Sequence, residues 1–288
     1  MTLSRILAVA LWFALLSPSS FATQASCTFN TFSAPPGYTL SAVESVSDDG
    51  TVVGQLENNT TLALVAFMRA ADGTITQYAA PKSTMTWLNG RNGSGANAGC
   101  YLDNANIPHV HGFLLQGTQF SAINYPNALN TWALGINQLG AVAGAFSKAS
   151  VTKGFVLANG KYKVIAYSGA QQTFAQAIND HGDLVGSYSS TPINHGFLWQ
   201  NGKFTTIDDP GAKYGTGLTG VNNSGVIVGN RIFADNDSGF IYQNGAFKNI
   251  VYTGAKSTTA GGINNNGLIA GQIFFKVGSS LGYTAICK

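Results

Sequence analysis

The sequence contains little charge. Asp, Glu, Lys and Arg make up 9% of the 288 residues, against about 25% in an average soluble domain. The basic residues are scattered singly, without the clusters that bind nucleic acid, so we exclude nucleic acid as a partner. Disorder is also excluded, because 45% of the residues are hydrophobic and their burial can offset chain entropy.

Long apolar runs are absent beyond the first residues. The chain starts with one basic residue, Arg5, followed by an apolar run over residues 6–16 and a small, polar stretch before Cys27. This order is typical of an export signal, and the run is too short to span a bilayer. We predict a signal peptide over residues 1–25 and a secreted domain over residues 26–288, extracellular or periplasmic, with no membrane span. A retained membrane anchor and a lipid-bearing Cys27 are the alternatives.

Helical periodicity is missing too, and the chain instead contains an internal repeat. A polar turn, a glycine, three residues and a second glycine recur, as in "INDHGDLVG" and "VNNSGVIVG". The first glycines, spaced 45, 45, 42, 43 and 42 residues apart, are Gly50, Gly95, Gly140, Gly182, Gly225 and Gly267. A period of this length indicates a propeller or a solenoid.

A second signature follows each glycine pair and defines further strands. It is a small residue followed by an aromatic one, as in Gly196-Phe197, and in three repeats it leads to Asn-Gly and another aromatic residue. Asn-Gly between apolar runs is a strong hairpin signal. Four short strands in roughly 43 residues are typical of a propeller blade. We therefore predict an all-β fold, a six-bladed β-propeller of four-stranded antiparallel blades.

The two ends of the chain complete this prediction. The last repeat contains only three strands, and a fourth lies at the start as "CTFNTF". In this register Cys27 and Cys287 occupy the two positions that Asn and Gly hold in the hairpin turns of other repeats. We predict a Cys27–Cys287 disulfide in place of the turn, with the N-terminal strand closing the last blade. Accidental cysteines and an intermolecular bridge are the alternatives.

Two further columns of the repeat have a structural interpretation. Small residues that suit close approach of inner strands near an axis recur at Ser45, Gly90, Gly135, Ala177, Gly220 and Gly262. Two positions later, polar side chains suited to bonding turn backbone recur at Ser47, Asn92, Asn137, Asn179, Asn222 and Asn264.

The combination of the two signatures resembles the HAF-repeat proteins, exported bacterial proteins named after a His-Ala-Phe-like tripeptide. The nearest matches are "HGFLL" at His111 and "HGFLW" at His195, with glycine in place of alanine. The resemblance covers Cys27 to the end of the chain. It implies an extracellular or periplasmic propeller, and it brings no established activity or catalytic residue.

Residues with catalytic or metal-binding chemistry are few. Glu44 is a weak candidate for a catalytic acid or base, because its register places it on an innermost strand beside the predicted channel; a solvated wall residue is the alternative. His109, His111 and Cys100 lie close in sequence, but a fourth zinc ligand is not evident, and we interpret Cys100 as a core thiol. We predict no metal and no cofactor.

Aromatic residues provide candidate binding residues. We expect the loops between blades to hold Tyr38, Trp87, Trp132, Phe174 and Tyr214. A hydroxyl residue recurs at one aligned position, Ser41, Thr86, Thr131, Thr173, Thr216 and Thr258. Such loops emerge on one face of a closed propeller, where aromatic rings can stack on sugars or contact a protein. Packing of these rings between blades is the alternative.

The sequence therefore favours a noncatalytic binding or cell-envelope interaction module with a carbohydrate or protein ligand. The alternative is an extracellular hydrolase or lyase that acts on a glycan or another small substrate at the channel face. We favour the first, because the sequence has neither a recognisable acid pair nor a nucleophile motif.

Overall fold

The computed structural model describes residues 23–190, 193–233, 237–276 and 279–288. Most of the predicted signal peptide therefore lies outside the described residues. The described residues form strands and connecting turns and contain no helix, which confirms the all-β prediction. Accordingly, they include no helix with the length and hydropathy needed to span a membrane.

Within the described residues, the strands form sheets of nine, eight, four and four strands. Antiparallel pairing divides these sheets into groups of four strands, which we call units 1 to 6, and single parallel residue pairs join some neighbouring units. Unit 1 contains β3 (Tyr38–Val46), β4 (Val52–Asn58), β5 (Leu64–Arg69) and β6 (Ile75–Tyr78). Unit 2 contains β7 (Ser83–Arg91), β8 (Ala96–Asp103), β9 (Val110–Gln116) and β10 (Gln119–Ile123). Unit 3 contains β11 (Asn130–Ile136), β12 (Val142–Lys148), β13 (Val151–Ala158) and β14 (Lys161–Ile165).

The remaining units follow the same order along the chain. Unit 4 contains β15 (Gln172–Ile178), β16 (Leu184–Ser189), β17 (His195–Gln200) and β18 (Lys203–Thr206). Unit 5 contains β19 (Thr216–Val221), β20 (Ile227–Arg231), β21 (Ser238–Gln243) and β22 (Ala246–Asn249). Unit 6 contains β23 (Ser257–Ile263), β24 (Leu268–Lys276), β25 (Ser279–Cys287) and, from the other end of the chain, β2 (Cys27–Phe32).

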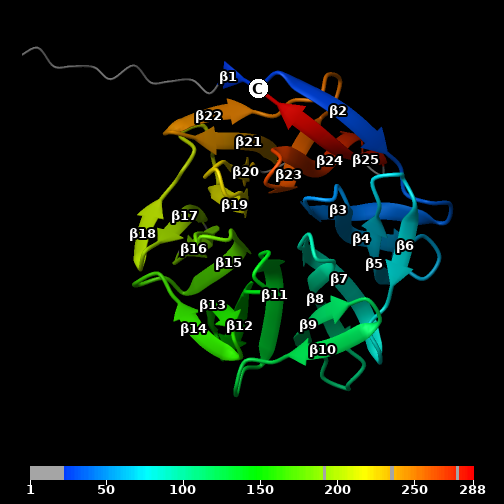
Figure 1. The fold of residues 1–288 in the computed structure, drawn as a ribbon, viewed down its shortest axis with the longest axis vertical. Coiled ribbons are helices and arrows are strands. Elements are labelled where there is room, and N and C mark those ends of the chain that lie inside the picture. The colour runs from blue at the N-terminus through cyan, green and yellow to red at the C-terminus, as the bar shows by residue number, and fades with distance from the viewer. Residues whose placement is uncertain (1–22, 191–192, 234–236, 277–278) are drawn as a thin grey trace, which may run out of the picture.

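The units are arranged in a ring, with the first strand of each unit on the inside (Figure 1). Because each unit is a simple up-and-down meander, the turns after first and third strands lie at one end of the ring, which we call the turn end. The connections after second and fourth strands lie at the other end, which we call the loop end. Every innermost strand therefore runs from the loop end to the turn end.

A strand from near each end of the described residues contributes to unit 6. Strand β2 pairs antiparallel with β25, and Cys27 lies opposite Cys287. The two cysteines form a disulfide with an S–S distance of 2.06 Å, which confirms the predicted bridge. Strand β1 (Thr23–Gln24) pairs parallel with β22 of unit 5, and Ala25 is buried. These contacts involve residues 23–25, which precede residue 26, where the predicted domain begins.

One aromatic residue per unit forms the centre of its core. These residues are fully buried and are the aromatic members of the second signature, Phe67, Phe113, Phe155, Phe197, Phe240 and Tyr283. Close approach explains the small residues of the innermost strands, as predicted. A Cβ added to Gly90 would lie 3.0 Å from the Cα atom of Gly135 in the next unit.

Candidate functional site

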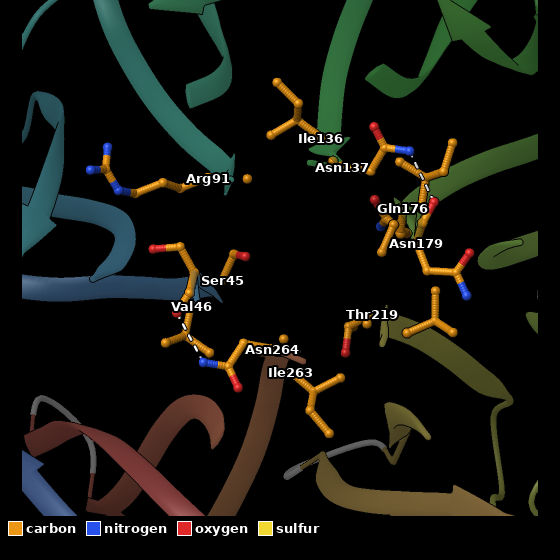
Figure 2. A pocket seen from close by; sticks show the side chains of 18 of the residues that line it. Ser45, Val46, Arg91, Ile136, Asn137, Gln176, Asn179, Thr219, Ile263 and Asn264 are labelled. Carbon is orange, nitrogen blue, oxygen red and sulfur yellow. Dashed lines mark hydrogen bonds between the residues drawn. The ribbon is translucent and has the colours of Figure 1, made fainter. Parts of the chain in front are cut away.

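A cavity of about 230 Å³ lies on the axis of the ring, among the six innermost strands. Its lining comes from the last residues of these strands and the first residues of the turns that follow, so the cavity lies toward the turn end. The side chains that Figure 2 labels around the opening come from all six strands and include those of Ser45, Arg91, Ile136, Gln176, Thr219 and Ile263.

A β-bulge in each innermost strand supplies one residue of the cavity wall. In β3 the pairing with β4 skips the residue between Val43 and Ser45, and the same shift recurs in the other five innermost strands. Bulges re-aim side chains and are common beside functional sites. The skipped residues, all of which line the cavity, are Glu44, Asn89, Leu134, Gln176, Thr219 and Gly261. Each unit thus contributes one variable residue to the same cavity.

Glu44 is the acidic member of this column and lies on an innermost strand, where the sequence analysis placed it. Its Oε1 accepts a hydrogen bond from Nε2 of Gln55 on β4 at 2.9 Å. Burial raises the pKa of the Glu44 carboxyl above its ordinary value, and the bond from Gln55 opposes this only in part. Gln55 was not among the predicted site residues. The sequence does contain a signal for it. Gln55 directly follows the second glycine of the repeat, and this position lies on the second strand, beside the innermost strand.

A series of hydrogen bonds surrounds the cavity at the turn end. Oδ1 of Asn179 accepts from the main-chain N–H of Asp183 at 2.9 Å, within its own turn. Its Nδ2 donates to the carbonyl oxygen of Asn222 in the next unit at 3.2 Å. Asn92, Asn137, Asn222 and Asn264 make the same two kinds of contact. The predicted turn role is confirmed, and a link between units is added to it.

The junction between units 1 and 2 differs from the other junctions. Ser47 stands in the asparagine column, and the bonds its hydroxyl donates stay within its own turn. An ion pair spans this junction, with Nη2 of Arg91 3.5 Å from Oδ2 of Asp49. The guanidinium of Arg91 points away from the opening (Figure 2) and also donates to Gly95 and Asn97.

Two aspartates at the turn end of the cavity are held by hydrogen bonds. Asp48 accepts from the side chains of Asn265 and Gln138, each at 3.0 Å. Asp180 accepts from the main-chain N–H of Gln138 and from Nδ2 of Asn223. These contacts join different units, so both carboxylates have a structural role.

Three of the predicted binding residues lie at equivalent positions around the axis. Trp87, Trp132 and Phe174 lie within β7, β11 and β15, so their predicted placement in loops is wrong; pairing with the second strand extends these strands toward the loop end. Each ring is half-buried. The rings of Trp132 and Phe174 pack edge to face with centroids 6.0 Å apart. We call these three residues the aromatic arc.

The other three innermost strands have small residues at this register position, namely Ala42, Gly217 and Thr259. A Cβ atom added to Gly217 would meet no other atom within 4 Å. Strand β19 therefore has open space beside Gly217, at the position where β7, β11 and β15 have the aromatic rings of the arc.

The remaining predicted binding residues are not part of the arc. Tyr38 begins β3 and packs against the core of unit 1 beside Leu40 and Phe67. Tyr214 lies in the loop before β19, is 41% exposed, and has the Lys213 ammonium 5.4 Å from its ring centre.

The recurring threonine anchors the connection that precedes it. Oγ1 of Thr131 accepts from the main-chain N–H of Tyr125 at 3.0 Å, and the same bond recurs at Thr86, Thr173, Thr216 and Thr258. In three connections the anchored residue is a tyrosine, and its ring packs on the second strand of the unit. The rings of Tyr125 and Phe146, for example, stack with centroids 3.5 Å apart. These features are structural, and they account for a pattern that the sequence analysis linked to binding.

The histidine motif has a packing role in the two units that contain it. The ring of His195 stacks on Tyr188 at 5.1 Å, and its Nδ1 lies 2.7 Å from Oδ2 of Asp208. His111 stacks on Tyr101 in the same way and contacts Asn124. Cys100 is buried, and its Sγ contacts Asn89 and the carbonyl oxygen of Ala133. The described residues contain no group of three side chains suited to a metal ion.

Comparisons with known proteins identify the fold. No family model and no curated protein matches the sequence. Among solved structures, the chain is similar to TolB from Acinetobacter baumannii, with 11% identity, a TM-score of 0.56, and 82% of this chain and 63% of that chain covered. It is similar to a mutant of the Aleuria aurantia lectin in complex with alpha-methyl-L-fucoside, with 12% identity, a TM-score of 0.52, and 86% and 91% covered.

A third similar structure is the β-propeller domain of the Trilobed protease from Pyrococcus furiosus, with 8% identity, a TM-score of 0.50 and 92% of each chain covered. At such low identity these likenesses concern the fold alone. The chain therefore has the fold of the β-propeller proteins. The resemblance to the HAF-repeat proteins stays a prediction.

Proposed function

We propose that the protein is an exported, closed, six-bladed β-propeller whose repeats are of the HAF type. The six antiparallel units, the ring in Figure 1 and the pairing of β2 with β25 support this architecture. The disulfide supports an oxidising, extracytoplasmic location. In this proposal the signal peptide ends at or before Ala22. Cleavage after Ala25 would remove strand β1 and would expose to solvent the residues that Ala25 covers.

We infer that the propeller is a noncatalytic binding module that takes a carbohydrate at its axis. The observation that carries this inference is the aromatic arc. Three half-buried rings occupy one register on consecutive innermost strands, and a strand farther round the ring leaves open space at the same register. Aromatic rings present a flat apolar surface with little conformational entropy to lose, which suits stacking against the apolar face of a sugar ring.

The chemistry of the axial cavity supports the same ligand class. Gln176 supplies an amide group, and Oδ1 of Asn89 and Oγ1 of Thr219 supply acceptors, which suit the donor and acceptor groups of sugar hydroxyls. A few polar groups beside apolar surface are typical of small-molecule sites, and the arc lies two residues before Asn89, Leu134 and Gln176 on the same strands. The lectin among the similar structures is a propeller-like protein bound to a fucoside, which is consistent with this ligand class without assigning a sugar.

A glycan array followed by calorimetry with the best oligosaccharide tests the inference. We expect Trp132→Ala to weaken binding about tenfold or more, equivalent to about 1.4 kcal/mol. Gly217→Trp should fill the open space and reduce binding by a similar factor without unfolding the protein. Trp199→Ala is the matched control, because Trp199 is half-buried on β17, outside the arc, and contacts Lys163.

Equal binding by wild type, Trp132→Ala and Gly217→Trp would contradict the axial site. Binding to a protein and to no glycan would replace the carbohydrate by a protein ligand. The enzymatic alternative depends on Glu44 in the cavity, and a panel of chromogenic glycosides tests it. Turnover that disappears in Glu44→Gln would replace the noncatalytic function by a hydrolase or lyase.

A further inference from the structure

A buried hydrogen-bond acceptor beside Glu44 lacks a donor. Gln55 is 7% exposed, and its Nε2 donates to Oε1 of Glu44. Its own Oε1 is inaccessible to solvent and has no partner among the described residues. Exchanging the amide oxygen and nitrogen would not solve this, because the oxygen would then face the carboxylate. A buried acceptor without a donor is costly and requires an explanation.

The equivalent positions of other units point to a donor at this place. Nδ2 of Asn89 donates to the carbonyl oxygen of Ala133, and Oγ1 of Thr219 donates to that of Ala260, each at 2.9 Å in the next unit. Leu88 occupies the same position in unit 2 as Ala133 does in unit 3 and Ala260 in unit 6. The carbonyl oxygen of Leu88 is therefore the equivalent acceptor for Glu44. An ionised carboxylate has no proton to donate, so it suits neither this oxygen nor Oε1 of Gln55.

The charged and titratable groups around Glu44 do not favour a negative charge. Asp48 and Asp180 line the same cavity and are acidic. Arg91 is the basic residue of the lining, and its guanidinium bonds Asp49, Gly95 and Asn97 instead. The thiol of Cys100 on β8 is neutral, because burial raises its pKa to about 12. Burial also raises the pKa of Glu44, in the same direction as the geometry requires.

We propose that Glu44 is a neutral carboxylic acid in the folded protein, paired with the Gln55 amide through two hydrogen bonds. Nε2 of Gln55 donates to one carboxyl oxygen of Glu44, and the protonated second oxygen donates to Oε1 of Gln55. The axial cavity then has no negative charge at Glu44, which favours an uncharged ligand. This last step rests on the proposed binding function, whereas the protonation state does not.

Carbon-13 NMR of glutamate-labelled protein tests the protonation state directly. Glu44 and Glu57 are the two glutamates of the sequence, so the spectrum contains two side-chain carboxyl resonances, and the one lost in Glu44→Gln belongs to Glu44. We expect its titration midpoint to lie above the midpoint of the same carboxyl in the urea-unfolded chain. A midpoint at or below the unfolded value overturns the proposal.

The pH dependence of unfolding gives an independent readout. Because the folded-state pKa of Glu44 is raised, its contribution to stability is complete below the unfolded pKa and is lost as pH rises through the folded pKa. Glu44→Gln keeps an uncharged donor and acceptor at all pH values and should not show this loss. Glu57→Gln, on the same strand as Gln55, is the matched control and should show it as wild type does. Identical pH profiles for wild type and Glu44→Gln overturn the proposal.

A ligand experiment separates this proposal from the proposed function. If a glycan binds, its affinity for wild type should fall as pH rises through the Glu44 midpoint, and its affinity for Glu44→Gln should not change over that range. Absence of any glycan ligand would contradict the proposed function and leave the NMR result unaffected. If a glycan binds with an affinity that does not depend on Glu44, the protonation state of Glu44 has no role in ligand binding.

Discussion

The two ends of the ring follow different rules. At the turn end, five of the six junctions among the described residues have the same asparagine contact between neighbouring units. At the loop end, the residues whose main-chain N–H groups bond to the recurring threonine differ between units, and so do their side-chain contacts. Tyr125 stacks on Phe146 in unit 3, whereas Asp209 forms a buried ion pair with Arg231 at 2.7 Å in unit 5.

This difference follows from the number of bonds that each position makes. An asparagine at the turn end satisfies its own turn with Oδ1 and the next unit with Nδ2, so few other residues can replace it. At the loop end the threonine hydroxyl satisfies the backbone alone, and the side chains beyond it are free to vary. The loop end is therefore where the units can acquire different functions, and the aromatic arc lies toward that end.

Removal of the disulfide should have the largest effect at the turn end. Cys27 and Cys287 take the place of a turn between the third and outer strands of unit 6 and are 260 residues apart in sequence. Closing so long a loop reduces the entropy of the unfolded chain, so the double variant Cys27→Ser, Cys287→Ser should lose on the order of 5 kcal/mol. Urea unfolding at equilibrium measures this loss.

Cys100→Ala is the control, because it removes a cysteine and keeps the bridge. A loss of under about 1 kcal/mol in the double variant would mean that the pairing of β2 with β25 holds the ring closed without the covalent link.

Breaking the buried ion pair should have the next largest effect, at the loop end. Arg231→Met leaves the Asp209 carboxylate, which is 3% exposed, without its cation. Loss of one partner of a buried pair costs about 3–5 kcal/mol. The double variant Asp209→Tyr, Arg231→Phe introduces the residue types that stack in unit 3, and it should recover most of this loss in the same unfolding measurement. A double variant no more stable than Arg231→Met would show that the two kinds of contact are not interchangeable.

The sequence predicted the features that depend on short-range geometry. The glycine spacing, the Asn-Gly turns and the register of Cys27 against Cys287 indicated the strands and the disulfide, because each has a local cause in the backbone. The placement of Trp87, Trp132 and Phe174 in loops was wrong, since the length of an innermost strand is set by its pairing with the second strand. The partner of Glu44 was missed for a related reason. The contact between Glu44 and Gln55 depends on a bulge, and one skipped residue is not visible in a pattern of alternating side chains.

Breaking one asparagine link should have the smallest of these effects. Asn179→Ala removes the bond to Asn222 and leaves the main-chain N–H of Asp183 without its acceptor, so we expect a loss of about 1–3 kcal/mol in urea unfolding. Ser47→Ala is the matched variant at the same column. Because Ser47 donates no bond to unit 2, this variant should cost less than Asn179→Ala. Equal losses would mean that bonds within the turn stabilise the turn end and that the links between units add little.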